Sequence, residues 1–519
     1  MKNWLIFIVL GIIYFALAIK DPFITNNLIS NLEPGPDTFY YSVPAWNLVH
    51  GNGFKMVAHG VEIRRIVPPL YGLTLVPFFK IFNDVRSYYF LNLLLDFISI
   101  YLFLILIKEF FGKEGYLLKF ALGLVLVTNF YFYNLPTLLM AENLLIPLTL
   151  AAAILMIKKL DLKNFILSLL IIPILAFTKV SSFPVLVVFG IVLMIKIISS
   201  KFLYKIPKKM YWFLIPLLVL VVVVTLSKIV LPNIEALSGA GNNFSPVFLG
   251  KTLPIFLKEF VGIDGKYLWY NNQQIEKFVG ILALFGMLFG LFLRKFRINI
   301  FILGSVILMV TVFHSLMSYP EGRYISTVVP LFLIFAGILF EKFKSPFLII
   351  IFLGIYFLSR GTINGFYERK VTSLKRQILN NRLEENEVPW NYRAMENFNS
   401  YFREENNDTY LGSLINPFYV MYFGNGNYQY LPISVSQEFS GKGKGFIEKI
   451  YEDDKTIVSL YRRLLTEGKK VYVTNYYLKN YKGSKEPEYK NLEDSFKLTQ
   501  VKDGCLGECK IYLVELRKK

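Results

Sequence analysis

The sequence predicts a polytopic α-helical membrane protein that carries a soluble α/β domain in its C-terminal part. Its 519 residues are 54% hydrophobic and 17% aromatic, which is well above the apolar share of a typical soluble protein. Apolar runs of about 17 to 22 residues recur up to Leu358, and each is long enough to cross ~30 Å of hydrocarbon as a helix. From Arg360 onward the sequence is charged, rich in tyrosine and free of long apolar runs.

About eleven membrane-spanning helices are expected from these runs. The candidate spans are 3–19, 87–107, 117–134, 140–157, 164–178, 181–199, 210–231, 277–293, 298–316, 324–340 and 346–359. The first run resembles a signal peptide because Lys2 precedes it. It is long, however, and no small-residue cleavage site follows it. We therefore expect a retained first span with the N-terminus inside.

The run 68–82, "PPLYGLTLVPFFKIF", is not counted among these spans, because two prolines open it, Pro77 interrupts it and Lys80 lies near its end. As a helix its 15 residues would reach only ~22 Å, which is less than the hydrocarbon core. If this run lies along the outer surface, the basic clusters of the later loops all fall on one side of the membrane, as the positive-inside rule requires. These clusters are Lys108/Lys113/Lys119, Lys158/Lys159/Lys163, Lys196/Lys201/Lys205/Lys208/Lys209, Arg294/Lys295/Arg297 and Lys342/Lys344. The odd number of spans then places the C-terminus outside.

The chain is expected to divide near residue 360. Residues 1–360 would form the transmembrane domain, with a first outer loop at 20–86, and residues 361–519 would form a soluble extracytoplasmic α/β domain. The C-terminal part alternates helical patterns such as "DKTIVSLYRRLLTEG" with short strand-like runs. Those runs are "KKVYVTNYY", "SFKLTQV" and "CKIYLVEL", which are rich in the β-branched and aromatic residues that favour strands.

Familiar motifs of nucleotide and hydrolase chemistry are absent from the sequence. It contains no P-loop, no GxGxxG opening a helix, no HExxH and no GxSxG. Its three histidines are too scattered for a metal motif. Its two cysteines, Cys505 and Cys509, either close a hairpin disulfide on the outside or stay as thiols. The net charge of +19 does not require nucleic acid, because basic residues of a membrane protein mark cytoplasmic loops or contacts with anionic lipid.

Charged residues gather at the outer ends of several expected spans. These residues are Asp37, Arg64, Arg65, Glu142, Lys179, Glu321 and Arg323. Taken one at a time, each has a structural explanation: a lysine or arginine can snorkel at a helix end, and Glu142 can favour the positive N-terminal end of the helix that follows it. Taken together they indicate chemistry, because separate loops would otherwise each place functionless charges on the same side. Asp96, in the middle of the span 87–107, is instead expected to hydrogen-bond to a neighbouring helix.

The chemistry that these residues suggest is transfer from a lipid phosphate. An anionic leaving group at the membrane surface needs cations to stabilise its developing charge, and an incoming hydroxyl needs a carboxylate to accept its proton. A lipid-anchored donor also explains why no nucleotide motif is present. The alternatives are a flippase or exporter of lipid-linked glycans, and a polymerase or ligase of such glycans. A flippase needs no base at Asp37, and it usually carries charged or broken helices through the bilayer.

Five segments together resemble the GT-C glycosyltransferases. "PDTFYYSVPAWNLVHGNGF" followed by "PPLYGLTLVPFFKIF" is similar to the first outer loop of the protein O-mannosyltransferases and the bacterial aminoarabinose transferases. "AEN" before a span resembles the second acidic site of the family, "FTKVSSFPVL" its lysine-containing third loop, and "GRYISTVVPL" its late segment from Arg-Tyr to Pro. The resemblance covers roughly residues 1–360.

The resemblance implies an inverting transferase that uses a polyprenyl-phosphate-linked sugar on the outer side of the cell membrane. Asp37 would be the catalytic base and Glu142 the second acid. The residues near the donor phosphate would be Arg64, Arg65, Lys179 and Arg323. Many relatives have a second acid directly after the first, whereas Thr38 follows Asp37 here, so a divalent metal remains an open alternative. The candidate acceptors are lipids, glycans and proteins.

Aromatic and histidine side chains near these charges are expected to contact the substrate. Tyr40, Tyr41 and Trp46 follow Asp37 closely and would wall the site or stack on sugar rings. Further substrate-binding candidates are His50, Tyr71 and His314, although a histidine on an apolar helix such as His314 more often packs than binds. After these aromatic residues, Gly51 and Gly53 would let the loop turn back towards "PPLY".

Overall fold

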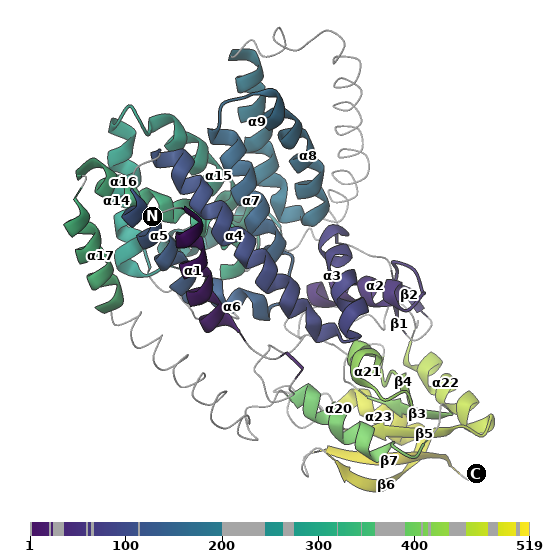
Figure 1. Ribbon diagram of the computed structural model, residues 1–519. Helices are drawn as coiled ribbons and strands as arrows, with labels where there is room; N and C mark the ends of the chain where they lie inside the picture. The colour runs from purple at the N-terminus through teal and green to yellow at the C-terminus, as the bar shows by residue number, and fades with distance from the viewer. Residues whose placement is uncertain are drawn as a thin grey trace. The chain divides into compact units, whose positions relative to one another are not determined.

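A computed structural model describes most of the chain, and the described part is mainly helical (Figure 1). The described residues are 3–19, 22–23, 36–58, 61–63, 67–112, 115–199, 244–262, 275–318, 320–343, 345–358, 390–405, 408–413, 417–434, 453–475, 486–504 and 509–517. The chain forms two compact units. The first contains Met1–Lys20, Ile66–Thr74 and Tyr89–Asn380, and the second contains Asp21–Arg65, Leu75–Tyr88 and Asn381–Lys519. The predicted span 210–231 lies outside the described residues.

The apolar part of the chain forms helices close to the predicted positions. These helices are α1 (Asn3–Ala18), α4 (Tyr88–Phe111), α5 (Tyr116–Thr128), α6 (Phe130–Asn134), α7 (Glu142–Ile157), α8 (Leu162–Thr178), α9 (Phe183–Ser199), α14 (Lys277–Phe292), α15 (Arg297–Ser315), α16 (Val329–Phe343) and α17 (Pro346–Leu358). A further helix, α13 (Leu249–Phe260), lies outside every predicted span. Among the described residues, three helical stretches are long and apolar enough to cross a membrane. They are Val85–Phe111, Val180–Ser199 and Arg297–Ser315, with mean hydropathies of 2.4, 2.4 and 2.0. The other apolar helices are shorter.

The structure differs from the predicted bounds at two spans. The predicted span 117–134 is interrupted at Asn129, whose backbone is extended and whose Oδ1 accepts a hydrogen bond from the N–H of Phe132 at 3.2 Å. Asn129 therefore ends α5 and caps α6. The predicted span 324–340 becomes helical only at Val329. The residues before it form the 3₁₀ helix η6 (Gly322–Tyr324) and a turn, and Arg323 lies in η6.

Small residues allow helices α14 and α16 to pack closely. Gly286 and Gly290 are both buried and stand one turn apart in the segment "GMLFG". A Cβ atom at Gly286 would overlap the carbonyl oxygen of Phe335, and one at Gly290 would overlap the side chains of Ile300 and Ile338. This small-xxx-small spacing lets two backbones approach each other where water supplies no hydrophobic driving force, which is typical of helices packed inside a membrane.

A buried acid joins α1 to α4. Asp96 is 0% exposed, and Tyr14 donates its hydroxyl hydrogen to Asp96 Oδ2 at 2.5 Å. The Tyr14 ring also packs edge-on against Phe97, with 5.3 Å between the ring centroids. The expected hydrogen bond between Asp96 and a neighbouring helix is therefore confirmed.

The second unit contains a five-stranded mixed sheet. Its strands, β3 (Thr409–Gly412), β4 (Gln429–Leu431), β5 (Lys470–Thr474), β6 (Phe496–Gly504) and β7 (Cys509–Leu516), lie in the order β4-β3-β5-β7-β6. Strand β3 pairs in parallel with β4 and β5, whereas β7 pairs antiparallel with β5 and β6. The helices of this part are α20 (Trp390–Tyr401), α21 (Pro417–Phe423), α22 (Asp454–Thr466) and α23 (Glu486–Ser495). The three predicted strand-like runs are β5, β6 and β7. Cys505 and the side chain of Cys509 lie outside the described part.

The described part of the first outer loop belongs mostly to this second unit. It forms α2 (Pro36–Val49) and a hairpin of β1 (Met56–Ala58) and β2 (Val61–Ile63), followed by α3 (Leu70–Phe82). Gly51 and Gly53 have φ angles of 81° and 74°, which favour glycine and confirm the predicted turn after the aromatic segment. Asn47 Nδ2 donates to the carbonyl oxygens of Lys55 and Val57 at 2.9 Å each, and it thereby ties the hairpin to α2.

Helix α2 packs against α21 through one face. Phe39 lies 4.9 Å from Phe418 and Trp46 lies 5.5 Å from Tyr422 between ring centroids, and the hydroxyl groups of Ser42 and Tyr422 are 2.8 Å apart. Phe39, Ser42 and Trp46 follow the i, i+3, i+7 spacing of a single helix face. Residues of the first loop and of the C-terminal part therefore share one core.

Candidate active site

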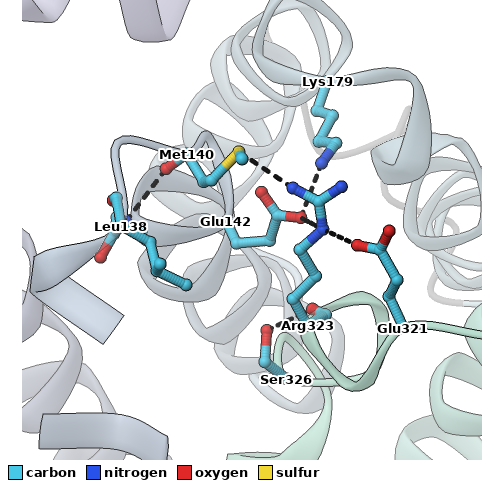
Figure 2. A network of polar contacts seen from close by, with 8 residues as sticks. Leu138, Met140, Glu142, Lys179, Glu321, Arg323 and Ser326 are labelled. Atoms are coloured by element: carbon cyan, nitrogen blue, oxygen red, sulfur yellow. Dashed lines mark hydrogen bonds and ion pairs between the residues drawn. The ribbon is translucent and has the colours of Figure 1, made fainter. Parts of the chain in front are cut away.

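Glu142 is the centre of a buried cluster of charges (Figure 2). It is the first residue of α7, and its side chain is only 2% exposed. Lys179 Nζ lies 2.6 Å from Glu142 Oε1, and Arg323 Nε lies 3.9 Å from the same oxygen. The negative charge of Glu142 is therefore balanced by two cations that come from other segments of the chain.

Two asparagines hold the loop that leads into α7. Asn92 Nδ2 donates to the carbonyl oxygen of Leu138 at 2.9 Å. Asn143 Nδ2 donates to the carbonyl oxygens of Leu138 and Met140 at 2.9 and 3.0 Å. Because both asparagines bind the same short backbone segment, they set where α7 begins and where the Glu142 carboxylate lies. The positive N-terminal end of the helix adds a further attraction for this carboxylate.

The 3₁₀ helix η6 and the turn that follows it, before α16, bring Arg323 to the cluster. Arg323 forms an ion pair with Glu321, and its Nη1 lies 3.0 Å from Met140 Sδ. Ser326 Oγ donates to the carbonyl oxygen of Arg323 at 2.6 Å and so fixes the turn. Figure 2 shows the guanidinium group between the carboxylates of Glu142 and Glu321. An uninterrupted helix over 324–340 would not have this turn.

The ring of Tyr324 connects the two cations to His314. Lys179 Nζ lies 5.9 Å and Arg323 Cζ 5.3 Å from the ring centroid, within the range of cation–π attraction. The His314 ring stacks on Tyr324 at 4.9 Å with an interplanar angle of 16°. Tyr324 was missing from the candidate residues of the sequence analysis, although it directly follows Arg323 in "GRY". An aromatic residue next to a candidate phosphate ligand was the signal that would have identified it.

Three acceptor atoms in this region are buried and have no hydrogen-bond partner among the described residues. They are Glu142 Oε2, Asn143 Oδ1 and His314 Nε2. The cluster as a whole contains two cations and two acids, so its formal charges cancel. A ligand that presents anionic oxygens to Lys179 and Arg323, and hydroxyl hydrogens to open acceptors such as Glu142 Oε2 and His314 Nε2, would complement both features.

The structure brings four of the predicted site residues together: Glu142, Lys179, Arg323 and His314. A fifth, Tyr71, also lies at this loop: its hydroxyl donates to Asn92 Oδ1 at 2.8 Å, and Asn92 holds Leu138. The shared location of these residues was predicted from topology, whereas their mutual contacts were not.

The remaining candidates belong to the first outer loop. Asp37 lies in the first turn of α2, and its side chain is outside the described part of the structure, as are Arg64 and Arg65. Tyr40 and Tyr41 are buried, at 5% and 1% exposed. Trp46 is half-buried, and its carbonyl oxygen lies 2.8 Å from Nδ1 of the exposed His50. In the residues that the structure describes, no group of three or more His, Cys, Asp and Glu side chains is arranged to hold a metal ion.

Comparisons with known proteins agree on one type of fold. Residues 262–389, which include α14 to α17, match the Alg9-like mannosyltransferase family. No curated protein sequence matches the chain. The structure is similar to that of ArnT from Cupriavidus metallidurans bound to undecaprenyl phosphate, with a TM-score of 0.57, 12% identity, and coverage of 98% of this chain and 97% of that chain. It is also similar to the Archaeoglobus fulgidus oligosaccharyltransferase in the apo form, with a TM-score of 0.50, 11% identity, and coverage of 91% of this chain and 69% of that chain.

The similarity to solved structures extends over nearly the whole chain at low sequence identity, so it shows the fold alone. The segment that matches the family model, residues 262–389, contains Arg323. Both agree with the helical membrane architecture that the apolar runs predict. The fold and the matched segment together confirm the resemblance that the sequence predicts, that of a membrane glycosyltransferase of the GT-C superfamily.

Proposed function

We propose that this protein is an inverting glycosyltransferase that moves a sugar from a polyprenyl-phosphate-linked donor to an acceptor hydroxyl at the outer face of the cell membrane. The observation that carries the proposal is the pairing of Lys179 and Arg323 around Glu142 in a buried setting. Among the solved relatives, ArnT is bound to undecaprenyl phosphate, and a lipid phosphate is the anion that two such cations at a membrane protein's helix ends would suit.

In the proposed reaction, the oxygen of the acceptor hydroxyl attacks the anomeric carbon of the sugar from the side opposite the phosphate. The new carbon–oxygen bond forms as the bond between the anomeric carbon and the phosphate oxygen breaks. The lipid phosphate leaves with the electron pair, and Lys179 and Arg323 stabilise its charge. Asp37 accepts the hydroxyl proton, because a carboxylate within hydrogen-bond reach of an attacking hydroxyl can act as its general base.

Glu142 has a different role in this proposal. It orients Lys179 and lies close to Arg323, so it holds both cations in place before the donor arrives. When a phosphate binds, it competes with Glu142 and Glu321 for the same cations, which helps the product phosphate to leave again. Arg64 and Arg65 are proposed as further phosphate ligands, and Tyr40, Tyr41, Trp46, His50 and Tyr71 as residues of the substrate pocket.

Reconstituted vesicles provide the test. Purified protein is supplied with a panel of undecaprenyl phosphates that carry radiolabelled sugars, together with lipid, glycan and peptide acceptors. We expect one label to become covalently attached to one acceptor, and we expect Lys179→Met to abolish most of this transfer. Lys295→Met is the matched control, because Lys295 pairs with Glu341 at 2.9 Å but is exposed and far from Glu142 in sequence. Label that crosses the bilayer without changing its chemical bond would show a flippase instead, and would overturn the proposal.

A further inference from the structure

We infer that His314 selects the donor sugar, and that its Nε2 accepts a hydrogen bond from a sugar hydroxyl. This inference rests on the proposed function. It starts from the position of His314 in the last turn of α15, where the side chain is 1% exposed. A polar ring buried so completely normally has partners for both nitrogens. Here Nε2 has none among the described residues.

The tautomer of His314 follows from its other nitrogen. Nδ1 lies 2.8 Å from the carbonyl oxygen of Val310. A carbonyl oxygen can only accept a hydrogen bond, so the proton must be on Nδ1. In the neutral ring Nε2 then carries a bare lone pair. The open atom of His314 is therefore an acceptor that needs a donor from outside the described protein groups.

The surroundings of the ring decide which donor can reach it. The Tyr324 ring, on which His314 stacks, is also the ring approached by Lys179 Nζ and Arg323 Cζ. A ligand whose phosphate is held by these two cations therefore places the groups next to its phosphate near His314. In the proposed donor, the two groups attached to the phosphate are the sugar and the polyprenyl chain.

Other parts of the donor cannot satisfy Nε2. A phosphate diester has acceptor oxygens only, so it would repel the lone pair, and a polyprenyl chain has no polar hydrogen. A sugar hydroxyl, or the amino group of an amino sugar, supplies the missing hydrogen. A site built to pair with one hydroxyl rejects an analogue that lacks it far more strongly than an apolar pocket rejects a change of shape, because the buried acceptor is then left unpaired.

Three substitutions at one position separate the acceptor from the ring. His314→Gln places an amide oxygen near the position of Nε2, His314→Asn places one near Nδ1, and His314→Phe keeps a flat ring without any acceptor. Each variant is assayed with the sugar donor that the wild type uses and with the matching series of monodeoxy donors. Binding of undecaprenyl phosphate without a sugar is measured for each variant as well, and elution as a single species in detergent shows that it is folded.

For the wild type, we expect kcat/KM with one deoxy donor to be at least ~10-fold lower than with the parent donor. In His314→Phe, kcat/KM should fall for the parent donor but not for that deoxy donor, so that the preference is lost. His314→Gln should recover part of the preference, His314→Asn should not, and all three should bind undecaprenyl phosphate as the wild type does. If His314→Phe lowers kcat/KM equally for the parent and every deoxy donor, or leaves the preference intact, the inference is wrong while the proposed function stands. If the wild type neither binds undecaprenyl phosphate nor transfers any sugar, the proposed function fails and the inference fails with it.

Discussion

The hydroxyl group of Tyr422 lies 2.8 Å from that of Ser42, a residue 380 positions earlier in the chain. Ser42 Oγ also donates to the carbonyl oxygen of Thr38 at 2.8 Å, which uses its single hydrogen. Tyr422 must therefore be the donor in the pair. Burial raises the pKa of Tyr422, so the phenol keeps the proton that it donates.

We expect Ser42→Ala to destabilise the protein more than Tyr422→Phe. Ser42→Ala leaves the buried phenol hydrogen without an acceptor, at a cost of about 1–3 kcal/mol in the free energy of unfolding, whereas Tyr422→Phe leaves only an under-used oxygen. The double variant should cost less than the sum of the two single variants. Tyr428→Phe is the control, because Tyr428 donates to a different residue, Asn399, at 3.0 Å. Thermal unfolding in detergent measures all of these effects, and additive costs for Ser42→Ala and Tyr422→Phe would contradict the pairing.

Asp37→Asn tests the proposed base. The substitution keeps the shape of the side chain but removes its basicity, so we expect a loss of at least ~10²-fold in kcat with donor binding largely retained. Thr38→Ala, at the adjacent position, should lose much less. Both variants are assayed as purified proteins with the labelled donor and acceptor. Near-full transfer by Asp37→Asn would assign the base to Glu142 or to another group.

Lys179 and Glu142 are best tested as a pair. Lys179→Met removes one of the two positive charges that lie next to the buried Glu142 carboxylate. We expect this substitution to lower the free energy of unfolding by about 3–5 kcal/mol. Adding Glu142→Gln should restore most of this stability. It should not restore donor binding, which loses the charged contact of Lys179 with the phosphate, worth about 1.5–3 kcal/mol. A stable double variant that binds the donor like the wild type would show that Lys179 serves the fold alone.

Acid should weaken the C-terminal sheet through Glu405. The hydrogen bond from Lys470 at 2.8 Å, together with that from Thr409, holds the pKa of Glu405 below its ordinary value of 4.5. A lowered pKa in the folded state means that this stabilisation is present above pH 4.5 and is lost as the pH falls through the lower folded value. Glu405→Gln should therefore flatten the fall of the melting temperature over this acidic range. Lys470→Gln should flatten it too, and a wild-type slope in both variants would exclude the pair as the cause.

Topology can be tested independently of activity. We predict that Glu142, Lys179 and the C-terminal part lie on the outer side, and that the loops with Lys205 and Arg294 lie inside, because the basic clusters alternate with the expected spans. Single cysteines are introduced into a chain whose Cys505 and Cys509 are replaced by serine. A membrane-impermeant maleimide is then added to intact cells. Labelling near Lys205 but not in the C-terminal part would show that the topology is the reverse of the predicted one.

Much of the helical architecture could be predicted because each apolar helix is encoded in a continuous run of residues. Local interruptions of these helices were harder to predict. Asn129 interrupts an apolar run through a side-chain cap that the run itself does not indicate, and the turn before Val329 has apolar residues that resemble a helix start. Where local capping competes with apolar length, the run alone predicts the wrong boundary.

The candidate site, too, could be predicted only in part from the sequence. The positions of Glu142, Lys179 and Arg323 at helix ends were predicted from charge and topology. Their contacts were not predicted, because a sequence contains no distances between loops. Tyr324 was not identified, because aromatic residues are common throughout this chain. The contact between Ser42 and Tyr422 joins residues so far apart in the chain that no local pattern could indicate it.

The hydrogen bond between Tyr14 and Asp96 has a consequence for how the protein is made. An acid in the middle of an apolar helix opposes release into lipid, by about 2.5–3.5 kcal/mol on scales measured for insertion by the translocation machinery. Tyr14 belongs to the first helix, so it is synthesised long before Asp96 leaves the ribosome. The first helix therefore already offers a hydrogen-bond donor when α4 is synthesised. The order of the two helices along the chain is thus the order in which we expect them to enter the bilayer.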